Sequence, residues 1–84
     1  MQQPRRVIIT GASSGIGAAL ARRYAQQGAV LGLIARRAPT LRQIAAQLST
    51  RCETYPADVR DAASLAAAAR DFIGRHGCPD IVIA

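Results

Sequence analysis

A chain of 84 residues has room for one small domain at most, and none of its apolar runs approaches the roughly 20 residues that a membrane-spanning helix needs. Half of the residues are hydrophobic and the mean hydropathy is +0.10, which favours a folded protein over a disordered one. The formal charge is +6, but the arginines that carry it are scattered and have no interleaved aromatic residues, which argues against a nucleic-acid partner. We therefore expect a cytoplasmic protein with no membrane or nucleic-acid partner.

The cysteines and the histidine suggest no metal site. Cys52 and Cys78 do not form a CxxC pair, and His76 is the only histidine. This set lacks the ligand spacing that zinc requires, so we predict two free thiols and no metal.

Strands and helices are predicted to alternate along the whole chain. Four strands are expected, over residues 5–10, 30–35, 52–56 and 80–84. The first helix should span residues 15–27, with Gly28 as its left-handed terminating residue. The second helix should begin within residues 38–40, and the third should extend from an Asp61 cap to a stop at Gly77.

The apolar residues of the second and third helices recur at helical spacing. In the second helix we expect Leu41, Ile44 and Leu48 to be buried. In the third helix the predicted apolar stripe consists of Leu65, Ala69, Phe72 and Ile73.

The strand sequences predict an α/β fold with a parallel sheet. The first, second and fourth strands are nearly continuous apolar runs, as expected for parallel strands covered on both faces. The third alternates polar and apolar residues and ends in Pro56, which suits a sheet edge. Right-handed crossovers then predict the strand order 3-2-1-4 of a Rossmann-type sheet, the N-terminal half of a doubly wound fold. The first two helices should cover one face and the third helix the other.

The turn after the first strand predicts a phosphate site. It contains Gly11, Gly15 and Gly17 and opens directly into the first helix. The first amides of a helix lack intrahelical partners and point, with the positive end of the helix dipole, towards one place. A phosphate fits that place. The predicted reversal of strand order between strands one and four lies beside this turn, and ligands of open α/β sheets bind at such a reversal.

The same turn also satisfies G-x-S-x-G, the nucleophile elbow of the α/β-hydrolases, with Ser13 as the nucleophile. An aspartate and His76 follow in the order that a hydrolase would need. However, only one strand precedes the turn, and this interpretation leaves Gly17 and the Arg36/Arg37 pair unexplained. His76 is expected near the end of the third helix, where the dipole favours a cation.

Four motifs in register resemble the short-chain dehydrogenase/reductase family. The stretch 10–17, Thr-Gly-Ala-Ser-Ser-Gly-Ile-Gly, is similar to the TGxxxGIG signature of that family. The other three are residues 35–37 after the second strand, residues 58–59 after the third, and residues 79–84, which lead towards the Asn-Ala-Gly segment of the family. The resemblance covers the whole chain and implies that this is the cofactor-binding part of a family member.

The resemblance, together with the charge at the end of the second strand, gives ten expected cofactor-binding positions. The backbone around Gly11, Ser13 and Ile16 should surround the pyrophosphate and the adjoining ribose, while Gly15 and Gly17 allow the turn and close helix packing. The carboxylate of Asp58 should accept a hydrogen bond from the adenine amino group. The expected cofactor-binding residues are Gly11, Ser13, Ser14, Gly15, Ile16, Gly17, Arg36, Arg37, Asp58 and Val59.

The end of the second strand predicts NADP as the cofactor. Members of the family that bind NAD usually carry an acidic residue here to hold the ribose 2′-hydroxyl, and this chain has Ala35. Arg36 and Arg37 follow it, and their guanidinium groups can pair with the 2′-phosphate of NADP. The hydroxyl of Ser13 or Ser14 could add a further contact to that phosphate.

No catalytic residue is assigned. The family transfers hydride with a serine, a Tyr-x-x-x-Lys pair and an asparagine, all beyond the position that matches Ala84, and this chain contains no lysine. Residues 1–84 are therefore expected to be the N-terminal portion of one NADP-binding domain without its catalytic half, and to be inactive alone. A full-length parent should be a homo-oligomer that acts on an alcohol or carbonyl substrate. The alternative is a non-catalytic nucleotide-binding fragment.

Overall fold

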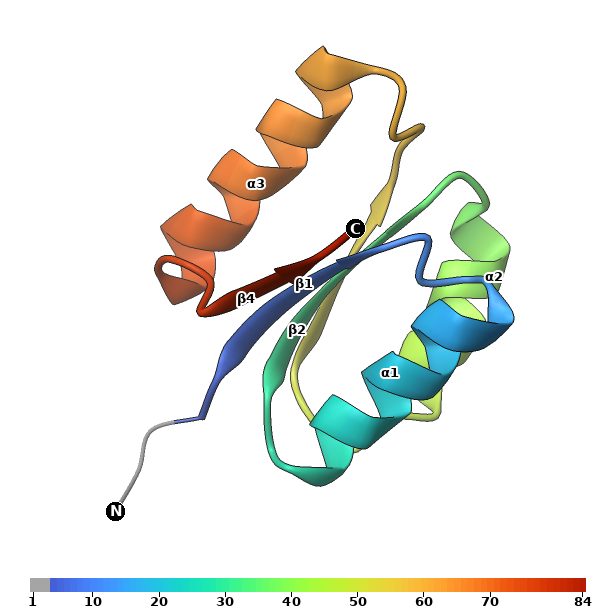
Figure 1. Ribbon diagram of the computed structural model, residues 1–84, viewed down its shortest axis with the longest axis vertical. Coiled ribbons are helices and arrows are strands. Elements are labelled where there is room, and N and C mark those ends of the chain that lie inside the picture. The colour runs from blue at the N-terminus through green and yellow to red at the C-terminus, as the bar shows by residue number, and fades with distance from the viewer. Residues whose placement is uncertain (1–3) are drawn as a thin grey trace.

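Short β-favouring runs alternate with alanine-rich helical segments, and the computed structural model, which describes residues 4–84, shows the elements that they form (Figure 1). The strands are β1 (Arg6–Thr10), β2 (Val30–Ala35), β3 (Cys52–Pro56) and β4 (Ile81–Ile83). The helices are α1 (Gly15–Gln26), α2 (Ala38–Ala46) and α3 (Ala62–His76). A helix lies between each strand and the next, so every connection is a helical crossover, as parallel strands require.

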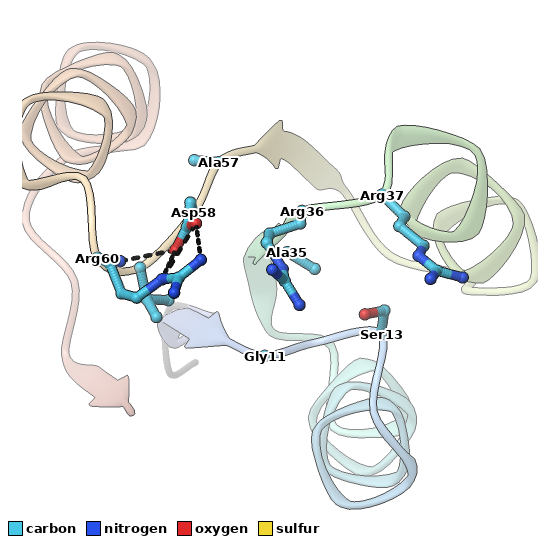
Figure 2. A pocket seen from close by; sticks show the side chains of 9 residues that line it. Gly11, Ser13, Ala35, Arg36, Arg37, Ala57, Asp58 and Arg60 are labelled. Atoms are coloured by element: carbon cyan, nitrogen blue, oxygen red, sulfur yellow. Dashed lines mark hydrogen bonds and ion pairs between the residues drawn. The ribbon is translucent and has the colours of Figure 1, made fainter.

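The strands form one parallel sheet in the order β3-β2-β1-β4, which confirms the predicted order. Strand β1 pairs with β2 on one side and with β4 on the other, so the direction of winding reverses at β1. Because the strands are parallel, their carboxyl ends lie at the same edge of the sheet. Gly11, Arg36 and Ala57, which directly follow β1, β2 and β3, therefore meet at this edge (Figure 2).

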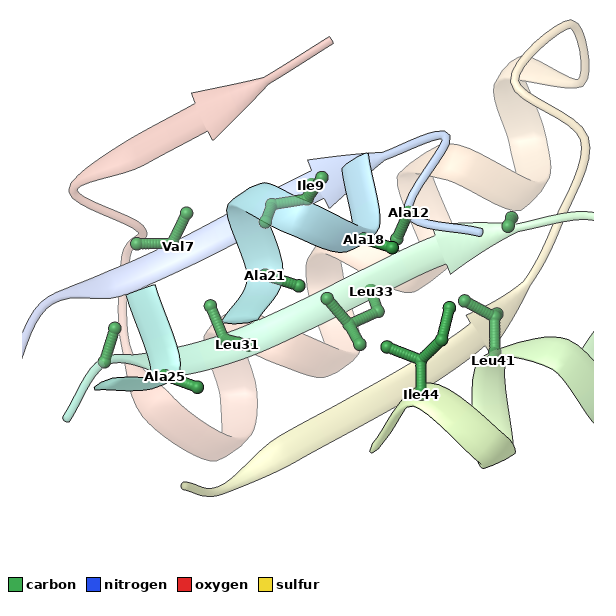
Figure 3. Close-up of a cluster of buried hydrophobic side chains, with 12 residues drawn as sticks. Val7, Ile9, Ala12, Ala18, Ala21, Ala25, Leu31, Leu33, Leu41 and Ile44 are labelled. Atoms are coloured by element: carbon green, nitrogen blue, oxygen red, sulfur yellow. The ribbon is translucent and has the colours of Figure 1, made fainter. Parts of the chain in front are cut away.

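Helices α1 and α2 cover one face of the sheet, where the larger hydrophobic cluster lies (Figure 3). Strands β1 and β2 contribute Val7, Ile9, Leu31 and Leu33, all fully buried. The residues that the two helices contribute are Ala18, Ala21, Ala25, Leu41 and Ile44. Alanine has no side-chain atoms beyond the Cβ methyl group, so α1 can lie close to the β-strands where it begins after the glycine turn.

Within residues 4–84, helix α3 alone covers the opposite face, the side that the strand order predicted (Figure 1). Its Phe72 is fully buried and packs with Ile8 and Ile34. The ring lies over Gly32, where an added Cβ would come within 2.8 Å of Phe72 Cδ2. Gly32 thus provides the space in the sheet that the Phe72 ring fills.

The predicted stripe of α3 is partly wrong. Phe72 is buried and Leu65 packs against the cluster, but the second buried position is Ala68, not Ala69. Ile73 is 41% exposed. Successive residues differ by about 100° around a helix, so the rotation that points Phe72 and Ala68 at the sheet turns Ile73 to the side. No second helix covers this face within residues 4–84.

Two element ends also differ from the prediction. Strand β4 is shorter than residues 80–84, and the carboxylate of Asp80 accepts a hydrogen bond of 2.8 Å from the Arg6 amide. Helix α2 ends at Ala46, so Leu48 lies beyond the helix, where it still packs half-buried against the core. The remaining boundaries agree with the prediction to within one residue.

The predicted helix caps are confirmed. The side chain of Asp61 accepts hydrogen bonds from the amides of Ala63 and Ser64, at 3.1 and 3.3 Å, and so caps α3. Gly28 has a φ of +80°, the left-handed conformation expected just after α1.

Among residues 4–84 no helix is long and apolar enough to cross a membrane. In the same part of the chain, no three histidine, cysteine, aspartate or glutamate side chains gather where they could hold a metal ion.

Candidate functional site

The turn between β1 and α1 is held by its own hydrogen bonds. Gly11 adopts a φ of +64°, and its carbonyl accepts hydrogen bonds from the Ser14 amide at 3.1 Å and from the Ser14 hydroxyl at 2.8 Å. Ser14 is also the N-cap of α1, because its Oγ accepts a hydrogen bond of 3.3 Å from the Gly17 amide. The Ser14 hydroxyl is thus engaged within the turn, which leaves Ser13 as the better candidate for a contact to a ligand.

The same turn leaves amides available at the start of the helix. Gly15 and Ile16 are the first two residues of α1, and an α-helix offers no internal partner to amides at these positions. Gly17 must lack a side chain, because an added Cβ would collide with the Gly11 carbonyl oxygen and would lie 3.0 Å from Ala12 Cα. The turn therefore approaches the helix closely and presents the unpaired amides at the carboxyl edge of the sheet.

A pocket of about 420 Å³ opens at this edge, where the turn meets the ends of β2 and β3 (Figure 2). It is lined by Gly11, Ser13, Ala35, Arg36, Arg37, Ala57, Asp58, Val59 and Arg60. Six of the ten predicted site residues are among them. Segments distant in the sequence are brought together here because their strands are neighbours in the sheet.

Arg36 and Arg37 supply uncompensated positive charge to the pocket. Both are exposed and follow the end of β2, and Arg37 is the N-cap residue of α2 without a capping side-chain bond. Among the described residues, no carboxylate lies within ion-pair distance of either guanidinium group. Figure 2 shows Ser13 on the turn facing the side of the pocket where Arg37 lies. This side of the pocket can take an anion.

Asp58 and Arg60 form a close ion pair on the other side (Figure 2). Arg60 Nη2 lies 2.9 Å from Asp58 Oδ2, Nε lies 3.2 Å from Oδ1, and the Arg60 amide donates to Oδ1 at 2.9 Å. The hydrogen bonds from the Arg60 side chain lower the pKa of the Asp58 carboxyl to about 2. The hydrogen bond from the Arg60 backbone amide and the positive charge of Arg36 add to this effect. Asp58 is therefore ionised at neutral pH.

We expect the Asp58 carboxyl to titrate near pH 2, and replacing Arg60 with alanine should raise this midpoint towards the ordinary value of about 3.9. A depressed folded-state pKa stabilises the fold above the unfolded value, and this contribution is lost as the pH falls towards 2. A carbon-detected NMR titration of the aspartate carboxyl groups measures the midpoint. The prediction would be contradicted if the Asp58 titration midpoint were the same in the original chain and in Arg60→Ala.

A second pocket, of about 350 Å³, adjoins the first on the side of β4. It is lined by Ile9, Thr10, Gly11, Ser14, Ile16, Gly17, Leu20, Val59, Ile83 and Ala84. Gly11 and Val59 line both pockets, so the two pockets adjoin at the end of β1. The first pocket is cationic and the second is mainly apolar, and Ile16, which lines the second, is 79% exposed.

The structure thus places nine of the ten predicted residues around these two pockets. Gly15 lines neither, although its amide belongs to the turn. The sequence interpretation missed Arg60, because a spacing of two residues from Asp58 does not indicate whether the two side chains form an ion pair. His76, considered above as a hydrolase residue, is instead the last residue of α3, where its Nε2 lies 3.2 Å from Glu53 Oε1 and its ring lies against Phe72.

Comparisons of the sequence with known proteins identify a family and several relatives. Residues 5–84 match the family described as short chain dehydrogenase. An uncharacterised oxidoreductase from Staphylococcus epidermidis is 40% identical over 76 residues, which cover 90% of this chain and 33% of that protein. The chain therefore spans about a third of the length of this relative.

Two solved structures share the fold and are at least 30% identical in sequence to this chain. L-sorbose reductase from Gluconobacter frateurii, complexed with NADPH and L-sorbose, has a TM-score of 0.84 and 30% identity, over 95% of this chain and 32% of that one. A metagenomic short-chain oxidoreductase in complex with NADP has a TM-score of 0.86 and 32% identity, over 93% of this chain and 37% of that one. Since the family match covers nearly the whole sequence, the chain belongs to the short-chain dehydrogenase/reductase family.

Proposed function

We propose that residues 1–84 are the N-terminal, cofactor-binding part of an NADP(H)-dependent oxidoreductase. The observation that carries this proposal is the unpaired Arg36 and Arg37 beside Ser13, at the end of a strand whose last residue is Ala35 rather than an acidic residue. Two free guanidinium groups favour a phosphate, whereas a ribose 2′-hydroxyl would be held by a carboxylate. The two related structures above contain NADPH or NADP.

The two adjoining pockets suit the two ends of a dinucleotide. In this proposal the adenosine end occupies the cationic pocket, with its 2′-phosphate at Arg36 and Arg37. Asp58 accepts a hydrogen bond from the adenine amino group, and Val59 lies against the adenine ring. The pyrophosphate lies at the amides that begin α1, whose dipole favours an anion. The apolar pocket beside Ile16 then takes the other end of the cofactor. Gly15 contributes by allowing the backbone to approach the pyrophosphate.

The reaction that we propose is hydride transfer between the bound nicotinamide and an alcohol or carbonyl compound. The cofactor supplies the hydride chemistry, and the described residues bind and orient it. The sequence contains no lysine, so a tyrosine–lysine pair for proton transfer is not available within these residues. We therefore expect the 84-residue chain to bind nucleotide without turning over substrate.

The Arg36→Ala variant tests the choice of cofactor. A charge-assisted hydrogen bond to a 2′-phosphate contributes about 1.5–3 kcal/mol, so NADPH should bind about tenfold to a hundredfold more weakly. The affinity for NADH should change little, because NADH lacks this phosphate. Isothermal titration calorimetry with both nucleotides measures the two dissociation constants.

Arg42→Ala is the matched control, since it removes the same charge from an exposed position on α2 outside both pockets. It should leave both affinities within about twofold of the original protein. Equal binding of NADPH and NADH by the unmodified chain would refute NADP as the cofactor. An unchanged NADPH affinity in Arg36→Ala would refute the role of Arg36.

A further inference from the structure

The cationic pocket contains one negative charge as well as its arginines. Asp58 lines the same pocket as Arg36 and Arg37, and its side chain remains 33% exposed. Figure 2 shows Arg36 projecting into the space between Asp58 and Arg37. A free carboxylate here would repel an anion bound at the arginine pair and would also attract Arg36 away from it.

The Asp58 carboxylate is not free, because it forms an ion pair with Arg60. Its guanidinium group reaches both Asp58 oxygens, with Nη2 2.9 Å from Oδ2 and Nε 3.2 Å from Oδ1. This bidentate geometry is the strongest form of an arginine–carboxylate contact, and it neutralises the negative charge of Asp58. Of the charged groups that line the pocket, Arg36 and Arg37 then remain as net positive charge.

We infer that Arg60 is a positioning residue that sets phosphate selectivity by shielding the 2′-phosphate site from the Asp58 carboxylate. This inference rests on the proposed NADP(H) site. The Arg60 side chain is 78% exposed and pairs with the Asp58 carboxylate. The hydrogen bond from the Arg60 backbone amide to Asp58 Oδ1 does not depend on the side chain at position 60. Replacing Arg60 therefore changes the charge of the pocket and leaves the local turn in place.

The direction of the effect follows from charge. Removing Arg60 leaves Asp58 as an unpaired carboxylate, and a ligand with a 2′-phosphate is repelled more than one without it. Removing the Asp58 charge as well should restore the selectivity, because Arg36 and Arg37 again face the phosphate without an opposing carboxylate. A direct Arg60–phosphate contact would not be restored in this way. The two explanations are thus distinguishable.

The experiment compares adenosine 2′,5′-bisphosphate with 5′-AMP, since these two ligands differ only in the 2′-phosphate. Calorimetry on the original chain and on Arg60→Ala gives the affinity ratio for each protein. We expect Arg60→Ala to lower the ratio about threefold to tenfold at low salt, and the difference should shrink as the ionic strength rises. Arg60→Ala/Asp58→Asn should return the ratio to within about twofold of the original.

Arg70→Ala on α3 is the control, because Arg70 is exposed and lines neither pocket. Thermal unfolding followed by circular dichroism verifies that each variant is folded, and the ligand ratio cancels any loss of active protein. An unchanged ratio in Arg60→Ala, or a double variant that stays as low as the single one, would overturn the inference alone. Equal binding of the two ligands by the original chain would overturn the proposed function on which it rests.

Discussion

Replacing Gly17 with alanine should destabilise the chain by about 3 kcal/mol and abolish nucleotide binding. The added Cβ would collide with the Gly11 carbonyl oxygen and would lie 3.0 Å from Ala12 Cα. Both are backbone atoms of the turn itself, so no side-chain rotation can relieve the contact. Overpacking costs typically 1–3 kcal/mol, and we expect the upper end because the backbone must move. The turn then opens and displaces the amides of Gly15 and Ile16.

This loss is large for so small a chain. At roughly 0.05–0.15 kcal/mol per residue, a domain of this length has a total stability of about 4–12 kcal/mol. Urea unfolding followed by circular dichroism gives the change in the free energy of unfolding, and calorimetry with adenosine 2′,5′-bisphosphate gives the change in binding.

Gly74→Ala is the matched control for the glycine-to-alanine change. Gly74 lies in the last turn of α3, where an added Cβ would have no atom of another element within 4 Å. Alanine is the better helix former, so this variant should gain about 0.5–1 kcal/mol and should bind the ligand normally. If Gly17→Ala kept both its stability and its affinity, a tightly packed turn could not be the basis of the site.

The turn, the strand order and the side of the sheet that each helix covers were predictable because they depend on local signals. Val30 and Ala35 bound an apolar run, Gly28 and Pro56 interrupt the pattern where elements end, and Asp61 stands where a cap is needed. Right-handed crossovers then leave few arrangements for four parallel strands. The carboxyl ends of the strands therefore lie at the same edge of the sheet, and the residues that follow them form the site.

The features that were missed depend on contacts between side chains distant in the sequence or on the rotation of a side chain. The apolar spacing of α3 is compatible with either Ala68 or Ala69 facing the sheet, and the choice follows from the docking of Phe72 over Gly32. Spacing alone contains no information about which residue of β2 lies opposite Phe72. In the same way, the Asp58–Arg60 ion pair requires the direction of an exposed side chain, which sequence patterns do not define.

Replacing Phe72 with alanine should have the largest effect of any change in the core. Phe72 is the bulkiest of the fully buried side chains and belongs to the smaller cluster, which α3 alone covers. Truncating a buried phenylalanine costs about 3–5 kcal/mol through lost burial and the cavity that remains. The Phe72 ring provides the nearest contacts above Gly32, so we expect its loss to leave Ile8 and Ile34 hydrated and to let α3 separate from the sheet.

The Gly32–Phe72 contact can be tested separately from the size of the cavity. Gly32→Ala alone should be destabilising, because the new methyl group would lie 2.8 Å from Phe72 Cδ2 and 3.2 Å from Cε2. In a Phe72→Leu background the same substitution should cost less, since the smaller side chain leaves room for the methyl group. Urea unfolding of the two single variants and the double variant gives the coupling energy, for which we expect about 1 kcal/mol or more. Additive losses would mean that α3 is placed by its other contacts, such as the Arg6 hydrogen bond to the His76 carbonyl, and not by the fit of one ring to one glycine.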